Sequence, residues 1–209
     1  MRLPEPPLLL ITDRRQARWP LVELVARAIG AGCRWISVRE KEMSEDDQVA
    51  LVRALLPIAW RDGARVSLHG DPALAKAANA DGVHLSARSD PIAARRLLGA
   101  DKLIGVSIHT ITEAEAIDPG MVDYAIAGPA FETESKPGYG PEIGRKGLAE
   151  IAAAARIPVL AIGGINAMRA AEVLAAGPAG IAVMGGVMRA VDPREEMKAL
   201  LATIPDARR

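Results

Sequence analysis

Short apolar runs alternate with longer amphipathic segments along the whole chain. Several of the apolar runs lack a polar residue at alternate positions, which is typical of strands buried on both faces of a parallel sheet. The segments between them have helical periodicity, and one begins at Ser44, a helix-capping residue followed by acidic residues at 45–47. The pattern predicts strands at residues 8–12, 34–39, 65–68, 82–85, 103–108, 123–127, 159–162 and 180–184.

A predicted helix follows each predicted strand, so the chain is a series of βα units. Pro57 lies inside the second helix and is expected to kink or shorten it. Thr112 is expected to cap a brief fifth helix that ends before Pro119. Eight units in 209 residues predict an α/β fold, a single-domain (β/α)8 TIM barrel over residues 1–209 with its core at about 8–204. The predicted helices span residues 21–31, 45–62, 72–79, 91–98, 113–118, 147–155, 166–176 and 193–203.

The composition agrees with a barrel and argues against several other classes of protein. Hydrophobic residues make up 50% of the chain but aromatic residues only 3%, so the core must be aliphatic, as barrel interiors are. A formal net charge of zero gives no electrostatic footprint for nucleic acid. No apolar run reaches the roughly 18 residues that span a bilayer, and the N-terminus lacks a signal-peptide pattern. Cys33 is the single cysteine, which fits a reducing compartment, and we expect a cytoplasmic protein.

Two pairs of glycines follow the last two predicted strands: Gly163 with Gly164, and Gly185 with Gly186. Paired glycines let backbone N–H groups approach an anion with no side chain in the way. The loops after strands seven and eight are the usual phosphate site of TIM barrels. The pairs therefore predict a phosphorylated small-molecule ligand, although a glycine pair after a strand also occurs as a simple helix-packing turn.

Other candidate site residues follow the remaining strands, at the end of a barrel where function is found. Arg39, Lys41 and Lys136 are able to surround several phosphate oxygens, and this is more positive charge than one phosphomonoester requires. The excess indicates a diphosphate leaving group stabilised by cations and Mg²⁺. The alternative is that Arg39, Glu40 and Lys41 form a solvated salt-bridge cluster.

Three histidines lie on or after predicted strands, and they have no zinc-site spacing. His69 and His109 are at strand ends, where each side chain either faces the pocket or turns away. His84 lies within a strand, and we expect it to pack or to form structural hydrogen bonds.

Six segments in this order resemble the thiamine phosphate synthase/TenI family, over most of the chain from about Leu8 to Ile204. The resemblance implies a (β/α)8 barrel that is often a homodimer. It also implies that synthase members join a hydroxymethylpyrimidine diphosphate to a thiazole phosphate, through a pyrimidine carbocation, and release pyrophosphate with the help of Mg²⁺. The segments are ISVREK (36–41), ADGVHL (80–85), IGVSIHT (104–110), GPAFETESK (128–136), AIGGI (161–165) and GIAVMGG (180–186).

The resemblance also implies roles for individual residues. Arg39 and Lys41 would hold the diphosphate, while Ser107 and Lys136 would contact pyrophosphate near the reacting centre. Thr133 and Ser135 would line the thiazole side. The thiazole phosphate would be cradled by backbone groups of the two glycine pairs, at residues 163, 164, 185 and 186.

The sequence departs from the synthase pattern at the metal ligands. Synthases carry Asn-Asp after strand three, where this chain has His69 and Gly70, with Asp71 one position later. A second metal-binding Asp aligns near Ser89, with Asp90 again one position later. Asp71 and Asp90 are therefore the expected Mg²⁺ ligands, each displaced by one residue from the synthase position. Metal sites tolerate shifts of their ligands of only tenths of an ångström.

Two alternative functions stay open from the sequence. A TenI-like thiazole tautomerase needs a proton carrier, and Pro129 stands where that branch has its histidine, so His69 or His109 would have to replace it. A non-catalytic protein that binds thiazole phosphate or thiamine phosphate is the other alternative. The long segment 128–144 contains glycines that would permit it to close over a ligand.

Overall fold

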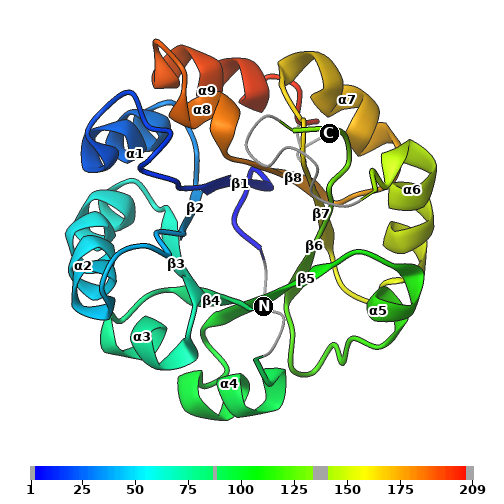
Figure 1. Ribbon diagram of the computed structural model, residues 1–209, viewed down its shortest axis with the longest axis horizontal. Coiled ribbons are helices and arrows are strands. Elements are labelled where there is room, and N and C mark those ends of the chain that lie inside the picture. Colours follow the sequence, from blue (N-terminus) through cyan, green and yellow to red (C-terminus); the bar gives the residue numbers. More distant parts are fainter. Residues whose placement is uncertain (1–2, 87–88, 134–140, 206–209) are drawn as a thin grey trace.

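The computed structural model describes residues 3–86, 89–133 and 141–205. Eight parallel strands form a closed barrel in which each strand pairs with the next along the chain and β8 pairs with β1 (Figure 1). The predicted (β/α)8 TIM barrel is confirmed. The strands are β1 (Leu8–Ile11), β2 (Trp35–Val38), β3 (Arg65–Gly70), β4 (Gly82–Leu85), β5 (Leu103–Ile108), β6 (Tyr124–Ala127), β7 (Val159–Ile162) and β8 (Gly180–Val183).

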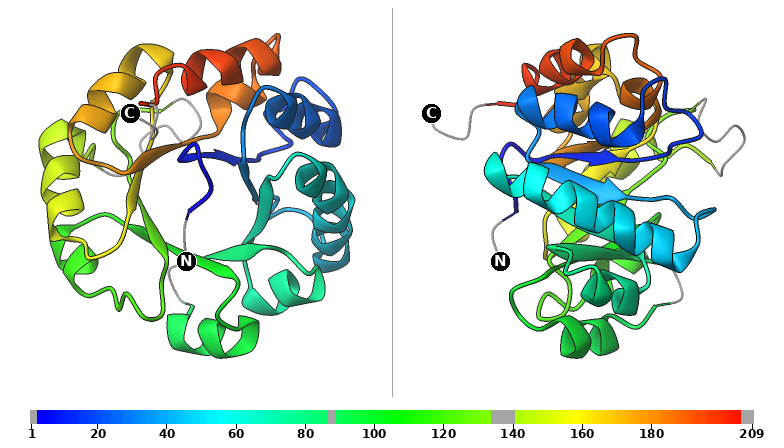
Figure 2. Two further views of the ribbon diagram at one scale, coloured as in Figure 1. Left: turned by 180° about the vertical axis from the view of Figure 1, so that it is seen from behind. Right: turned by 90° about the vertical axis from the view of Figure 1, so that its left-hand side faces the viewer.

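Helices surround this barrel, as Figures 1 and 2 show. Most of them occupy the predicted segments, and several begin at a side-chain cap, which satisfies backbone N–H groups of the first turn. The helices are α1 (Leu21–Gly30), α2 (Glu45–Arg61), α3 (Pro72–Ala77), α4 (Pro91–Leu98), α5 (Ile111–Glu115), α6 (Gly144–Ala154), α7 (Ala167–Ala175), α8 (Gly185–Met188) and α9 (Pro193–Leu201).

Three local predictions differ from the structure. Thr110, not Thr112, caps α5, because its hydroxyl accepts from the backbone of Glu113 while the Glu113 carboxylate accepts in return. Pro57 does not shorten α2, which continues past it to Arg61, and the kink that was the other expected effect stays a prediction. The short helix α8 directly after β8 was not predicted, since the glycines there indicated a turn.

The strands separate two layers of side chains. Alternate residues point outward to the helices, and the residues between them fill the barrel interior. On β1, Leu8 and Leu10 belong to the large outer core, whereas Leu9 and Ile11 belong to an inner cluster. The inner cluster consists of Leu9, Ile11, Trp35, Leu103, Tyr124, Ile126, Leu160 and Ala182.

The inner cluster closes the N-terminal end of the barrel. Trp35, Leu103 and Tyr124 are fully buried, and Leu3 packs against the cluster from the N-terminal segment, which crosses the barrel axis in Figure 1. Gly105 makes room for the Tyr124 ring, because a Cβ at this position would lie 2.1 Å from the Tyr124 Cζ atom. Side chains of the described residues therefore fill the barrel at this end, and the cavity lies at the C-terminal ends of the strands.

None of the helices in the described part of the chain is both long and apolar enough to cross a bilayer.

Candidate active site

A cavity of about 500 Å³ opens at the C-terminal ends of the strands, where the sequence predicts the site. Every strand, or the loop that follows it, contributes to the lining. Most of the predicted site residues line it: Arg39, Lys41, His69, Ser107, His109, Thr133, Gly163, Gly164, Gly185 and Gly186. Two of the others, Ser135 and Lys136, lie outside the described residues, as does the middle of segment 128–144.

Arg39 and Lys41 form a cationic side of the cavity. The Arg39 backbone N–H donates to Thr12 Oγ1 at 3.0 Å, which fixes the start of this loop. Burial lowers the pKa of Lys41, and the positive charge of Arg39 lowers it further. No carboxylate of residues 3–86, 89–133 or 141–205 forms an ion pair with either cation. Two neighbouring uncompensated cations are suited to a polyvalent anion.

Glu40 does not neutralise these two cations. Its side chain is buried, and Oε2 accepts a hydrogen bond of 2.9 Å from the backbone N–H of Arg14. Burial raises the pKa of the Glu40 carboxyl. The salt-bridge cluster of residues 39–41, the alternative interpretation of this triplet, is therefore not formed.

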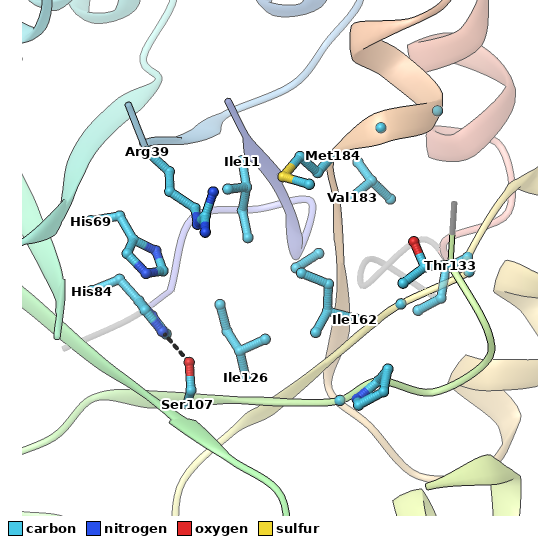
Figure 3. Close-up of a pocket in the computed structure, with 18 of the residues that line it drawn as sticks. Ile11, Arg39, His69, His84, Ser107, Ile126, Thr133, Ile162, Val183 and Met184 are labelled. Carbon is cyan, nitrogen blue, oxygen red and sulfur yellow. Dashed lines mark hydrogen bonds between the residues drawn. The ribbon is translucent and has the colours of Figure 1, made fainter. Parts of the chain in front are cut away.

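A chain of hydrogen bonds supports Ser107 from below the cavity. His84 is fully buried, its Nε2 lies 2.9 Å from Ser107 Oγ, and its Nδ1 lies 3.4 Å from the Tyr124 hydroxyl (Figure 3). Burial and the charge of Lys41 lower the pKa of His84 to about 3, so the ring is neutral at physiological pH. The prediction that His84 forms structural hydrogen bonds is confirmed.

The other two histidines both reach the cavity. The His69 ring lies beside that of His84, with 4.6 Å between their centroids. His109 Nδ1 lies 2.6 Å from the carbonyl oxygen of Gly128, and because a carbonyl only accepts, Nδ1 carries a proton and donates it. This bond fixes the orientation of the His109 ring at the cavity wall.

The opposite side of the cavity is largely apolar. Ile126, Ile162, Val183 and Met184 lie on or directly after β6, β7 and β8, across the cavity from Arg39, His69 and His84 (Figure 3). Thr133 lies at the edge of this side. An apolar wall excludes water from the space between the two sides.

The first glycine pair packs against the loop after β6. The backbone N–H of Ala130 donates to the Ile162 carbonyl at 2.7 Å, and that of Phe131 donates to Gly163 at 3.2 Å. Gly164 has φ +61°, and a Cβ there would lie 2.5 Å from the carbonyl oxygen of Glu132. These glycines therefore have two effects: they let the loops after β6 and β7 approach closely, and they leave backbone at the cavity lining without a side chain.

The second glycine pair has a different environment. A Cβ at Gly186 would meet only Glu196 Oε1, at an ordinary distance of 3.8 Å, and Gly186 has no positive φ. Packing therefore does not require glycine at position 186.

Two arginines at this corner were missed by the sequence analysis. Arg169 lies in the first turn of α7, Arg189 follows α8, and both line the cavity. Arg189 Nη1 donates to Gln16 Oε1. Their spacing in the sequence could have indicated them. Each arginine follows a glycine pair by one or two helical turns, and a helical side chain points toward the N-terminus of its helix, which here begins near the strand ends.

Asp71 and Asp90, the expected metal ligands, are helix caps. Asp71 Oδ1 accepts from the Ala73 N–H at 2.7 Å, and Asp90 Oδ1 accepts from the Ile92 N–H at 2.8 Å. Both residues are exposed, and neither belongs to the cavity lining. The residues that the structure describes contain no group of three or more His, Cys, Asp or Glu side chains that could hold a metal ion. In this arrangement both carboxylates cap helices outside the cavity, and the displaced Mg²⁺ site stays a prediction.

The sequence pattern of a family described as thiamine monophosphate synthase matches residues 8–187. The chain belongs to this family. Among curated members, it is 41% identical to the thiamine-phosphate synthase of Roseiflexus sp. (strain RS-1), over 95% of this chain and 85% of the relative. It is 38% identical to that of Chlorobium luteolum, over 100% of this chain and 98% of the relative.

A solved structure extends the comparison with this thiamine monophosphate synthase family to the fold. The thiamine phosphate pyrophosphorylase from Pyrococcus furiosus has a TM-score of 0.84 and 33% identity, with 94% of each chain covered. A 3-hexulose-6-phosphate synthase has a TM-score of 0.71 but only 19% identity, so it shows the shared barrel alone.

Proposed function

We propose that this protein is a thiamine-phosphate synthase, a transferase that couples hydroxymethylpyrimidine diphosphate to thiazole phosphate and releases pyrophosphate. Membership of the family supports this activity. The observation that carries the proposal is that one cavity has two separate groups of anion-binding elements. Arg39 and Lys41 follow β2, whereas the two glycine pairs and their arginines follow β7 and β8. Two phosphorylated substrates would therefore bind with their phosphates apart and their rings between them.

The first group would hold the leaving group. As the bond between the pyrimidine methylene and the diphosphate oxygen breaks, negative charge develops on pyrophosphate. Arg39 offers a forked donor and Lys41 a point charge, and neither has a carboxylate to displace within the described residues. Electrostatic stabilisation of this kind is strongest where water is excluded.

Ser107 would donate a hydrogen bond to the same anion. If the Tyr124 hydroxyl donates to His84 Nδ1, then Nε2–H donates to Ser107 Oγ, and the Ser107 hydroxyl proton points into the cavity. Because His84 is neutral, this polarity does not depend on pH near neutrality. Tyr124 and His84 are positioning residues in this arrangement, and Ser107 is the group that touches the substrate.

The apolar wall would protect the reacting centre. The pathway implied by the family passes through a pyrimidine carbocation, which water would capture. Ile126, Ile162 and Met184 line the side from which the thiazole nitrogen would attack. They offer no competing nucleophile and exclude water.

Several expectations from the resemblance remain predictions. The use of Mg²⁺ is one of them, since the described residues contain no group of three or more His, Cys, Asp or Glu side chains that could hold a metal ion. The roles of Ser135 and Lys136 concern residues outside the described ranges. The homodimer and the cytoplasmic location are likewise predictions.

The test is an assay of purified protein with both substrates, with Mg²⁺ or with EDTA, and with each substrate omitted as a control. We expect thiamine phosphate and pyrophosphate in equal amounts only when both substrates are present. Product in Mg²⁺ but not in EDTA would show a metal site completed by substrate or by residues outside the described ranges. Absence of product, from protein that still binds thiazole phosphate, would contradict the synthase.

A thiazole tautomerase is the second candidate, and the orientation of His109 favours it. A neutral histidine whose Nδ1–H is held by a carbonyl has its lone pair on Nε2, which is the tautomer that a proton acceptor at Nε2 requires. Isomerisation of the thiazole carboxylate phosphate is measured directly in wild-type protein and in His109→Gln and His69→Gln variants. An unchanged rate in both variants would contradict this candidate.

A further inference from the structure

Arg169 is held in place at the phosphate corner by two contacts. Its Nη1 donates to the Gly164 carbonyl at 3.3 Å, and its guanidinium carbon lies 4.7 Å from the centroid of the Phe131 ring. One contact is to the loop after β7 and the other to the loop after β6. The guanidinium is therefore oriented over the glycine turn at the cavity lining.

No acidic side chain neutralises this guanidinium. Within the described residues Arg169 forms no ion pair, and the nearby carboxylate of Glu172 on α7 pairs with Arg145 at 2.8 Å. A guanidinium has five N–H donors, and one carbonyl and one aromatic face leave most of them available. Arg169 therefore has the capacity to bind a planar pair of oxyanion oxygens.

The backbone N–H groups at the start of α7 are less available to an anion, because a side chain already caps them. Asn166 Oδ1 accepts from the N–H groups of both Met168 and Arg169, each at 3.1 Å. An anion at this corner could gain these two groups only by displacing the cap. The positive charge for it must therefore come mainly from side chains, and Arg169 is the one attached to this turn.

We infer that Arg169 is the side chain that selects a phosphate monoester at the glycine corner. The inference rests on the proposed function and deepens it, because it assigns recognition of the thiazole phosphate group to a residue outside the glycine turns. The backbone of residues 163–164 and 185–186 would contact the phosphate, and the Arg169 fork would bind two of its oxygens. Phe131 would hold the other face of the guanidinium.

The experiment compares Arg169→Gln with Arg61→Gln, a matched control on the exposed end of α2, where Arg61 pairs only with Asp62. Binding of thiazole phosphate, of the corresponding thiazole alcohol and of inorganic phosphate is measured by calorimetry. We expect Arg169→Gln to weaken thiazole phosphate binding by about 10- to 100-fold, as for loss of a charge-assisted hydrogen bond. Binding of the alcohol should change less than about 2-fold, and Arg61→Gln should match wild type.

A kinetic measurement separates selection from a structural role. In Arg169→Gln the KM for thiazole phosphate should rise while the KM for pyrimidine diphosphate is unchanged, and Arg169→Lys should recover part of the loss. Equal weakening for phosphate and alcohol, or no weakening, overturns the inference.

Binding and turnover also separate this inference from the proposed function. Wild-type protein that binds thiazole phosphate through Arg169 but forms no thiamine phosphate would overturn only the synthase. Wild-type protein that binds neither thiazole phosphate nor inorganic phosphate would overturn both.

Discussion

The two halves of the barrel interior differ sharply, although the same alternation of side chains builds both. The half formed by β2–β5 is mostly polar, and its polar residues continue below the cavity, where Ser37 and Ser67 are register partners on neighbouring strands and are fully buried. The other half, from β6 round to β1, is aliphatic except for Tyr124. Trp35 and Leu103 in the first half and Tyr124 in the second pack toward the N-terminal ends of the strands. The remaining inward or cavity-facing residues are Ser37, Arg39, Ser67, His69, His84 and Ser107 in the first half and Ile126, Leu160, Ile162, Ala182, Met184, Leu9 and Ile11 in the second.

This difference shows how one small cavity separates two tasks. Buried polar groups are costly, and hydrogen bonding repays this cost for His84 and Ser107, whereas the buried hydroxyls of Ser37 and Ser67 form no hydrogen bond with the described residues. The polar half suits binding of a charged leaving group. The aliphatic half suits contact with a ring and exclusion of water, and the charged residues that line the cavity on this side, among those the structure describes, are Glu132, Arg169 and Arg189.

Removing the charge of the polar half should have the largest effect. Arg39→Gln is expected to lower kcat/KM by about 10²–10³-fold, because a donor to the developing anion is lost in a water-excluded site. Steady-state kinetics measure this, with Arg61→Gln as the control. A loss of less than about 3-fold would mean that Arg39 does not contact the leaving group.

The glycine corner of the aliphatic half gives the next effect. Gly164→Ala places a Cβ 2.5 Å from the Glu132 carbonyl oxygen at a positive φ. Gly186→Ala places a Cβ at an ordinary distance of 3.8 Å from Glu196 Oε1. We expect Gly164→Ala to lower the free energy of unfolding by roughly 2–3 kcal/mol and Gly186→Ala to change it by less than about 0.5 kcal/mol. Urea unfolding of both variants tests this, and equal effects would contradict the packing argument.

The buried histidine of the polar half predicts a pH dependence of stability. The folded-state pKa of His84 is about 3, below its unfolded value, so the unfolded chain binds more protons between these two values. Stability therefore falls as pH falls, by about 2 kcal/mol for this residue between pH 7.5 and pH 5. His84→Gln should lose this part of the dependence. An identical pH profile in the variant would show that His84 is not the group responsible.

Adding a hydroxyl to the aliphatic half would test its role directly. Ile126→Thr should cost roughly 1–2 kcal/mol of stability, since the buried hydroxyl lacks a partner. It should also increase the fraction of pyrimidine diphosphate that is hydrolysed rather than coupled to thiazole. The ratio of free pyrimidine alcohol to thiamine phosphate measures this, with Ile126→Val as the control. An unchanged ratio would remove water exclusion as the function of this wall.

The smallest effect concerns the two aspartates at the rim of the polar half. Asp71→Ala and Asp90→Ala each remove a helix cap and should lower the free energy of unfolding by about 1 kcal/mol. Any activation by Mg²⁺ should be unchanged, because neither carboxylate lines the cavity. Loss of metal dependence in either variant would contradict this prediction and would support the displaced metal site expected from the sequence.

The fold was predictable because the apolar runs and the helical segments between them both indicate repeated βα units. Eight apolar runs with helices between them leave few arrangements other than a barrel. The errors lay at element ends, where the outcome depends on one hydrogen bond. Thr110 and Thr112 each have a glutamate three residues later, so spacing alone does not separate them, and the structure forms the capping box with Thr110 and Glu113.

The site was predictable where it follows from strand ends and not where it depends on helices. Arg39, Lys41 and the glycine pairs directly follow strands, so their position at the mouth follows from topology. Arg169 reaches the cavity from the first turn of a helix, and its relation to Phe131 depends on how two loops pack. Asp71 and Asp90 have the residue type of metal ligands, but both precede a proline at the first helical position, which is a capping signal that the resemblance obscured.

The N-terminal segment has a consequence for access to the cavity. With Leu3 packed on the inner cluster and Pro7 beside Gly180, the described residues fill the N-terminal end of the barrel. The cavity lies at the C-terminal ends of the strands. In the proposed reaction, both substrates would therefore enter, and both products would leave, on the side of the barrel that carries Arg39, Lys41 and the glycine pairs.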